Sequence, residues 1–233
     1  MNVVVTGASR GLGRSIAETF AARGGEIAVA ARTQTELDDL EDDFAKRFPD
    51  ARLLAFRTDL SQKQGVFAFA EAIKHRWNSV DVLVNNVGIF RPGKLLDDPE
   101  GFLENIMDIN FWPAYHLTRA LAPVMVKAGK GHIFNIGSVA SRDAYPDSGA
   151  YSISKFALLG FSKSLRMELR ESGIKVTDVL PGSTWTSSWK DTKIDPRRLL
   201  DADEVARAIY HAWEMGPSGF VEELVLRPQL GDL

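Results

Sequence analysis

The stretch VVVTGASRGLG, residues 3–13, decides the fold of this chain. Its three valines form a β-branched run that is typical of a buried parallel strand. The glycine loop leads into residues 15–23, where Ile16, Ala17 and Phe20 predict the apolar side of a helix. In such a strand–loop–helix unit, glycines let the backbone approach a pyrophosphate, and the helix N-terminus offers it free N–H groups. The stretch therefore predicts dinucleotide binding, with a simple glycine-rich turn as the alternative; its G-x-x-x-G-x-G spacing differs from the commoner G-x-G-x-x-G.

Outward from this unit, short apolar runs alternate with helical patterns. Thr33-Gln34-Thr35-Glu36 resembles a capping box that opens a helix ending before Pro49. A long helical region at 100–127 should kink at Pro113 and Pro123. Because alternating strands and helices require a parallel sheet with right-handed crossovers, we expect a Rossmann-type doubly wound α/β domain over residues 1–233, with seven strands and helices on both faces. Further strands are expected at 26–31, 53–56, 80–84, 133–136, 176–180 and 224–226, and further helices at 62–76, 150–170 and 201–213.

Composition narrows the class of protein. The chain has 233 residues, a net charge of −3 and 25% charged residues, so it shows no sign of a nucleic-acid partner. It has no cysteine, and its four histidines are scattered, so we expect neither disulfides nor a protein-built metal site. No apolar run reaches 18 residues, and a strand starting at residue 3 leaves no room for a signal peptide. We expect a cytoplasmic protein without a membrane partner.

Tyr151 and Lys155 lie four residues apart in an expected helix and therefore share one of its faces. An ammonium group beside a phenol favours the phenolate, so Lys155 should lower the pKa of Tyr151. A tyrosine tuned in this way can act as a general acid or base near neutral pH. The alternative is a packed ring beside a solvated amine, because this spacing is common. The surrounding motifs favour the catalytic interpretation.

Several further motifs follow one another along the chain. They are Thr6-Gly-x-x-x-Gly-x-Gly13, Asp59-Leu60, Asn85-Asn86-Val87-Gly88, Asn110, Ser138, Tyr151-x-x-x-Lys155 and Pro181-Gly182-x-x-x-Thr186. In this order they resemble the short-chain dehydrogenase/reductase family over essentially the whole chain. Val87 departs from the usual alanine, and we interpret it as a packing variant beside the cofactor.

The resemblance implies a carbonyl reduction by hydride transfer with four catalytic residues. Tyr151 would donate the proton to the alkoxide, and Lys155 would hold the nicotinamide ribose. Ser138 would orient the carbonyl oxygen; the alternative is a turn serine at the end of a strand. Asn110 would hold a water that links Lys155 to solvent, or it would satisfy a carbonyl freed by a kink near Pro113.

The end of the second strand predicts the cofactor. NAD enzymes place a carboxylate there, whereas this chain has Ala30-Ala31-Arg32-Thr33. Arg32, helped by Arg10, can bind a 2′-phosphate and so favours NADP. Asp59 should contact the adenine, or cap the next helix together with Ser61; Asn85 should lie near the ribose, and Thr186 near the carboxamide. The full expected cofactor set is Gly7, Ser9, Arg10, Gly11, Leu12, Gly13, Arg32, Thr33, Asp59, Leu60, Asn86, Val87, Gly88, Tyr151, Lys155, Pro181, Gly182, Thr184 and Thr186.

The substrate pocket is expected to be aromatic. A flat ring would suit such a pocket, although lid and core roles for these side chains are the alternative. The C-terminal sequence is similar to that of bacterial sepiapterin-reductase-like members of the family. In those proteins an acidic residue near the C-terminus anchors the pterin, which makes Asp232 a candidate; a frayed terminus is the alternative. The expected substrate residues are Ser138, Tyr145, Tyr151, Trp185, Trp189 and Asp232, with Phe90 beside them.

Three functions are compatible with these motifs. The first is an NADPH-dependent reductase of a small carbonyl compound, with a pterin side-chain ketone as the sharpest hypothesis. The second is a 3-oxoacyl-acyl-carrier-protein reductase, for which Lys190, Lys193, Arg197 and Arg198 could offer a basic docking surface. The third is a non-catalytic NADP-binding sensor, which would not need the proton donor. The family resemblance also implies a homodimer or homotetramer packed through the long helices.

Overall fold

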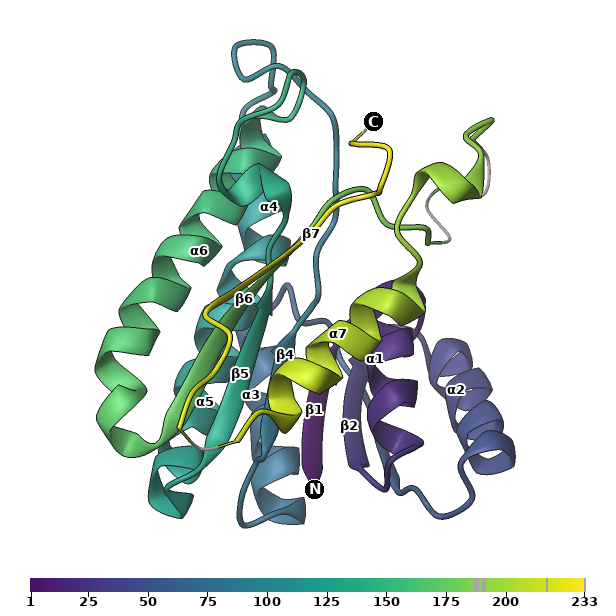
Figure 1. Ribbon diagram of the computed structural model, residues 1–233, viewed down its shortest axis with the longest axis vertical. Coiled ribbons are helices and arrows are strands. Elements are labelled where there is room, and N and C mark those ends of the chain that lie inside the picture. Colours follow the sequence, from purple (N-terminus) through teal and green to yellow (C-terminus); the bar gives the residue numbers. More distant parts are fainter. Residues whose placement is uncertain (187–188, 190–191, 217, 233) are drawn as a thin grey trace.

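Seven parallel strands form one sheet in the order β3-β2-β1-β4-β5-β6-β7 (Figure 1). This computed structural model describes residues 1–186, 189, 192–216 and 218–232. The winding reverses between β1 and β4, and in such sheets ligands bind at the carboxyl edge beside this switch. The doubly wound prediction is confirmed. The strands are β1 Asn2–Thr6, β2 Glu26–Ala31, β3 Leu53–Arg57, β4 Val82–Asn85, β5 Gly131–Ile136, β6 Ile174–Pro181 and β7 Glu223–Leu226.

Helices cover both faces of the sheet, with α1, α2 and α7 on one and α3, α5 and α6 on the other (Figure 1). No helix among the described residues is long and apolar enough to cross a membrane. The helices are α1 Gly11–Ala21, α2 Gln34–Arg47, α3 Lys63–Arg76, α4 Phe102–Asn110, α5 Trp112–Ala128, α6 Gly149–Leu169 and α7 Ala202–Glu214. The described residues also include the short 3-10 helices η1 Val139–Ser141, η2 Arg170–Ser172 and η4 Pro196–Arg198.

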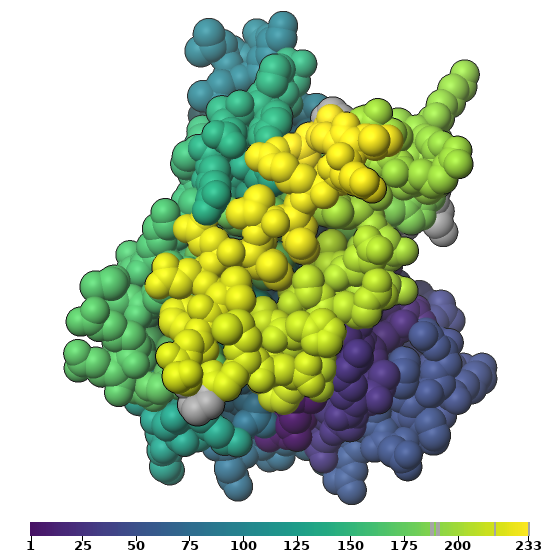
Figure 2. All heavy atoms as spheres, in the orientation of Figure 1, coloured from purple at the N-terminus to yellow at the C-terminus, as the bar shows by residue number. Residues whose placement is uncertain are grey.

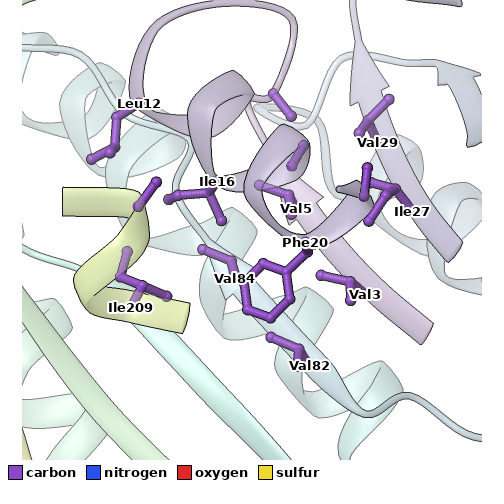
Figure 3. Packing of buried hydrophobic residues seen from close by; sticks show 14 of the residues in the cluster. Val3, Val5, Leu12, Ile16, Phe20, Ile27, Val29, Val82, Val84 and Ile209 are labelled. Carbon is purple, nitrogen blue, oxygen red and sulfur yellow. The ribbon is translucent and has the colours of Figure 1, made fainter. Parts of the chain in front are cut away.

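An apolar layer joins α1 and α7 to the sheet. Figure 3 shows Ile16 and Phe20 of α1 directed toward Val84 and Val82 of β4, with Ile209 of α7 closing the layer. These five side chains are all fully buried. Burial of each such side chain contributes about 1.5–3 kcal/mol, so this layer holds the start of α1 firmly against the carboxyl ends of the strands.

A second apolar layer lies between the sheet and helices α3, α5 and α6. It is interrupted by a cross-sheet polar row made of Asn85, Asn135 and Asp178. The three residues lie opposite one another on β4, β5 and β6. Asn85 Nδ2 donates to Asn135 Oδ1 at 2.7 Å, and Asn135 Nδ2 donates to Ser162 Oγ of α6 at 2.8 Å. Arg166 of α6 donates to Asp178 Oδ2 at 2.9 Å. Burial raises the pKa of Asp178 to about 6, against the opposing effects of Ser162 and Arg166. The row therefore ties α6 to two neighbouring strands.

Three local predictions are corrected. The first helix begins at Gly11, not at residue 15, because the glycine loop itself enters the helix. Thr33 precedes α2 as its N-cap, but its side chain makes no capping bond, so the predicted capping box is wrong. The long helical region is broken at Phe111, with φ −120° and ψ −55°; Pro113 lies in the first turn of α5, where a proline is tolerated.

The C-terminal segment lies over the surface of the molecule. Figure 2 shows it running beside α7 and reaching the segment near residues 140–150. β7 pairs with β6, with Leu226 opposite Pro181. Beyond β7, the Arg227 guanidinium donates to Tyr145 Oη at 3.2 Å and forms an ion pair with Asp232. The tail is thereby held at the carboxyl edge of the sheet.

His132 gives the fold a measurable pH dependence. The ring is 2% exposed, and its Nε2 lies 2.7 Å from Thr177 Oγ1. Burial, assisted by the charge of Lys175, lowers the pKa of His132 to about 3. At this residue the unfolded chain therefore binds a proton more readily, so the contribution of His132 to stability is full above about pH 6.5 and falls as the pH drops toward 3.

We expect the variant His132→Gln to lose less stability on acidification than the native chain. Below pH 6.5 the buried histidine should contribute a slope of up to about 1.4 kcal/mol per pH unit to the free energy of unfolding. Urea titrations between pH 7 and 4 measure this slope, with the exposed His75→Gln as the control. Parallel pH profiles for all three proteins would contradict the expectation.

Candidate active site

The glycine loop forms a tight cradle at the end of β1. Gly7 and Gly11 have φ of +64° and +58°, in the left-handed region that favours glycine. A Cβ on Gly13 would lie 2.3 Å from Gly7 O and 2.4 Å from Asn86 Nδ2. The Asn86 amide donates to Thr6 O at 2.9 Å and to Gly7 O at 3.1 Å, so the asparagine braces the loop from β4. The loop can turn and pack this tightly against β4 only because these positions lack side chains.

The N-terminus of α1 fits an anion. Arg10 is its N-cap in an extended conformation, and no side chain caps this end. Ser9 and Leu12 lie on either side of it in the loop. An uncapped helix N-terminus with a glycine turn beside it is the geometry that binds a pyrophosphate. The predicted loop residues are therefore placed together as a dinucleotide would require.

Tyr151, Ser138 and Lys155 lie at the carboxyl end of β5. Ser138 follows β5, and its side chain is near enough to Tyr151 to favour the phenolate form of that residue. Lys155 is 4% exposed, and its Nζ donates to the carbonyl oxygen of Ile136 at 2.8 Å. The same Nζ lies 5.7 Å from the centroid of the Tyr151 ring. The structure thus brings the three side chains together from β5 and α6.

The predicted lowering of the Tyr151 pKa is wrong, because the pKa is raised and Lys155 is not among the causes of the shift. Burial raises the pKa of Tyr151, and the hydrogen bond with Ser138 only partly opposes this. Burial also lowers the pKa of Lys155, to about 8. The physical reason is that both groups are desolvated and the ammonium is bonded to a backbone carbonyl rather than to the phenol. Near neutral pH, Tyr151 keeps its proton.

Ser138 also has the structural role of a turn serine at the end of a strand, which was the alternative interpretation of this residue. Its Oγ accepts from Ala140 N at 3.1 Å, and its backbone N–H donates to Ser141 Oγ at 3.1 Å. This reciprocal cap fixes the start of η1. The side chain is 9% exposed, so its position beside Tyr151 is well defined.

Asn110, at the end of α4, pins the loop that follows β4. Its Oδ1 accepts from Ile89 N at 2.8 Å, and its Nδ2 donates to Ile89 O at 3.0 Å and to Ser154 Oγ at 3.0 Å. A Cβ on Gly88 would lie 3.3 Å from Asn110 Oδ1 and 3.5 Å from Lys155 Nζ. Asn110 Oδ1 and Lys155 Nζ therefore both lie beside Gly88. The alternative, in which Asn110 satisfies a carbonyl freed by a kink near Pro113, is wrong.

On the adenosine side the structure corrects the expected Asn85–ribose contact and the alternative capping role of Asp59 and Ser61, whereas the Asp59–adenine contact stays a prediction. Asn85 is 3% exposed, and its amide faces α5 and β5 within the cross-sheet polar row, so it does not reach a ribose. The Leu60 side chain is buried in the core, which leaves only its backbone for a cofactor. Asp59 Oδ1 accepts from Ser61 N at 2.9 Å, but neither residue caps α3, whose N-cap is Gln62.

The remaining predicted cofactor residues lie along the same edge. Arg32 and Thr33 are exposed after β2. Val87 N donates to Thr6 Oγ1 at 3.1 Å, which places Val87 against the cradle. The sequence motif includes Thr6 but assigns it no role, whereas the structure shows Thr6 Oγ1 accepting from Asn86 N and Val87 N. The role of Ser154, which accepts from Asn110 Nδ2, has no local signal in the sequence.

The segment after β6 folds back over α1. Thr184 Oγ1 donates to Gly182 O at 3.0 Å, and Trp185 N donates to Leu200 O at 2.7 Å. A Cβ on Gly11 would meet Thr186 Cγ2 at 3.3 Å, so Thr186 lies over the cradle. A cavity of about 560 Å³ opens beside it, between Trp185, the outer face of α1 and the start of α7.

The expected aromatic pocket is only partly assembled. Phe90 meets Tyr151 edge-to-face at 5.0 Å between ring centroids. Tyr145 accepts from Arg227, a residue that the sequence did not single out. Trp185 lines the cavity beside α1, and Trp189 N donates to Thr186 O at 3.1 Å. Among the described residues, Phe90–Tyr151 is the only ring pair that involves these aromatics, so the prediction of one shared pocket is not supported by their contacts.

Comparisons with known proteins agree with this geometry. The family model for short chain dehydrogenases matches residues 1–196. A sepiapterin reductase of Chlorobaculum tepidum is 31% identical over 99% of this chain and 97% of its own. Among solved structures, a metagenomic short-chain oxidoreductase in complex with NADP superposes with a TM-score of 0.85 at 29% identity, over 98% of this chain and 97% of that one. L-sorbose reductase of Gluconobacter frateurii, complexed with NADPH and L-sorbose, has a TM-score of 0.89 at 25% identity, over 97% and 94%. The chain belongs to the short-chain dehydrogenase family.

Proposed function

We propose that this protein is an NADP-dependent oxidoreductase that reduces a carbonyl group, with Tyr151 as the proton donor. One observation carries the proposal. Ser138, Tyr151 and Lys155 converge at the carboxyl end of β5, where Lys155 Nζ donates to Ile136 O at 2.8 Å and lies 5.7 Å from the centroid of the Tyr151 ring. The glycine cradle lies at this same sheet edge, as hydride transfer to a substrate beside Tyr151 requires.

The proton-transfer step follows from these side chains. NADPH, when bound, supplies the hydride. Burial raises the pKa of Tyr151, so the phenol holds its proton until charge develops on the substrate oxygen, which suits an acid in the reductive direction. Ser138 Oγ orients that oxygen and stabilises its growing charge.

Lys155 and Asn110 support the proton donor. With a pKa of about 8, Lys155 remains mainly protonated at pH 7 and can stabilise the phenolate as it forms. Asn110 Oδ1 accepts one hydrogen bond from Ile89 and keeps a second lone pair, which suits the relay water implied by the family resemblance. The Asn110 contacts also hold Gly88 beside Lys155.

NADP is the cofactor that the residues favour. Arg32 and Arg10 are exposed near the adenosine end, and the strand end contains no carboxylate. Structures of NADP-bound relatives support this choice. A panel of carbonyl compounds with NADPH, followed by loss of absorbance, tests the proposal directly. Failure of every carbonyl on the panel to consume NADPH, with bound NADPH detected, would favour the sensor function.

A pterin side-chain ketone is the proposed substrate. The named sepiapterin reductase relative supports this hypothesis, and so does the geometry of Asp232. Among the described residues, Asp232 Oδ1 is buried without a hydrogen-bond partner, close to Gly182. Its other oxygen pairs with Arg227, so one acceptor remains for the N–H edge of a pterin.

We expect Asp232→Asn to raise KM for sepiapterin by about tenfold or more while the Kd for NADPH stays the same. Unpaired donors of the ring would then cost about 1–3 kcal/mol. Steady-state kinetics measure the effect. Asp143→Asn is the matched control, because Asp143 is the other carboxylate near Arg227, at 3.8 Å, and is largely exposed. Efficient reduction of acetoacetyl thioesters but not of sepiapterin would reject the pterin hypothesis.

The acyl-carrier alternative receives less support from its proposed docking residues. Arg197 is paired with Asp195 at 2.7 Å, and the Nε atom of Arg198 is buried. Lys193 is exposed, and Lys190 lies outside the described residues. The basic surface is therefore partly neutralised or turned inward.

We also propose a homodimer or homotetramer, as the family resemblance implies. Exposed apolar side chains lie on the two long helices: Trp112 and Val126 on α5, and Phe156 and Met167 on α6. Such a surface suits contact with a second copy. Light scattering of the purified protein measures the assembly, and a monomer at micromolar concentration would reject this proposal.

A further inference from the structure

We propose that Arg57 is a third arginine of the 2′-phosphate site, beside Arg32 and Arg10, and that it helps to select NADP over NAD. This inference rests on the proposed use of NADP. It concerns only the part of the cofactor in which the two nucleotides differ. It can therefore be tested separately from the reaction.

Strand pairing places Arg57 next to Arg32. Ala31 of β2 lies directly opposite Arg57 of β3, and Arg32 follows Ala31 in the chain. Thr58 N donates to Ala31 O at 2.9 Å, so the pairing continues past Arg57. Since neighbouring strands are about 4.8 Å apart, the backbones of the two arginines lie side by side at the same sheet edge, with Arg32 just beyond the end of β2, where strand alternation no longer sets its direction.

Side-chain alternation places Arg57 on the face of the glycine loop. Leu53 and Ala55 pack against the apolar layer formed with α1 and α2. Residues two apart on a strand share a face, so Arg57 continues this series beyond the apolar layer. Arg10, at the start of α1, lies on the same side of the sheet.

The three arginines have no anionic partner among the residues that the structure describes. In the described part of the chain, none of their guanidinium groups forms a hydrogen bond or an ion pair, and all three residues are exposed. By contrast, Arg14 and Arg47 on the same face both pair with Asp43, at 2.6 and 3.0 Å.

The local acid does not neutralise Arg57 either. Asp59, two residues further on, directs Oδ1 at the backbone N–H of Ser61. Adjacent like charges repel one another, so an edge with three unpaired arginines is favourable only with a multivalent anion. A phosphate monoester has three acceptor oxygens and close to two negative charges, and it can accept charge-assisted bonds from several guanidinium groups.

The test compares Arg57→Gln with Arg52→Gln. Arg52 is an exposed arginine just before the opposite end of the same strand, so it controls for the loss of one surface charge. We expect Arg57→Gln to raise the Kd for NADPH about tenfold, the usual size of a lost charge-assisted bond. The Kd for NADH should change less than twofold, and Arg52→Gln should change neither. Fluorescence titration of the full-length protein gives all four values.

Two further measurements separate the outcomes. Adenosine 2′,5′-bisphosphate should compete less well with NADPH in Arg57→Gln, while 5′-AMP should compete equally in both proteins. Arg57→Lys should restore part of the affinity, because it keeps the charge but loses the planar fork. An unchanged Kd for NADPH, or an equal loss for NADPH and NADH, would overturn the role of Arg57. If the native chain binds neither nucleotide, the proposed function itself fails.

Discussion

Replacing Tyr151 with phenylalanine should lower kcat by about 10²–10⁴-fold while NADPH binding stays intact. The substitution removes only the hydroxyl that we assign as proton donor, and general acid catalysis contributes about this factor. The ring, which meets Phe90 edge-to-face, stays in place. Single-turnover and steady-state rates with NADPH and any accepted carbonyl measure the loss, and fluorescence titration measures the Kd for NADPH.

Tyr210→Phe is the matched control for this experiment. Tyr210 lies on α7 and packs against Phe20, away from Ser138 and Lys155, so its hydroxyl should not affect kcat. Near-native turnover in Tyr151→Phe would reject Tyr151 as the proton donor. A fall in both proteins would point to general destabilisation, which thermal unfolding would reveal.

Gly13→Ala should abolish high-affinity NADPH binding and destabilise the fold. A single methyl group there would lie 2.3 Å from Gly7 O and 2.4 Å from Asn86 Nδ2, so the backbone of the cradle must move. Overpacking of a rigid site costs about 1–3 kcal/mol. We expect the Kd for NADPH to rise by at least about 100-fold, since the displaced loop carries the anion-binding N–H groups.

Gly160→Ala separates this steric effect from helix propensity. Gly160 is an exposed glycine of α6, and a Cβ there would meet nothing within 4 Å. The same substitution should therefore stabilise the protein by up to about 1 kcal/mol. Urea unfolding measures both changes. Equal stabilisation in the two variants, with NADPH affinity retained, would show that the cradle is not sterically closed at Gly13.

The fold and most site positions follow from local sequence. The glycine loop directly after a β-branched strand predicts both a parallel sheet and its ligand-binding edge, because chain geometry allows few other arrangements. The strands were therefore placed to within a few residues. Boundaries such as the start of α1 at Gly11 were missed, since a loop glycine and a first-turn glycine have the same appearance in sequence.

Electrostatic and contact-level details could not be predicted in the same way. The raised pKa of Tyr151 depends on burial by residues distant in the chain, so the spacing to Lys155 alone gave the wrong direction. Asn85 and Asn86 are adjacent in the chain. The Asn85 side chain nevertheless points to the α5 face of the sheet, whereas the Asn86 side chain points to the glycine cradle. The importance of Arg57 depends on pairing between two strands, which no single segment of sequence contains.

The cross-sheet polar row has a consequence for folding. Apart from this row and the His132–Thr177 contact, the buried side chains of β4, β5 and β6 are mostly apolar, and apolar burial alone distinguishes weakly between registers of such strands. A slip of one residue would turn the Asn135 amide into the opposite apolar layer, and a slip of two would set it against Val176 or Leu180 instead of Asp178. Each buried amide left unpaired costs about 1–3 kcal/mol. The native register is thus the one in which Asn135 and Asp178 meet Ser162 and Arg166 of α6, the helix that also brings Tyr151 and Lys155 to the strand ends.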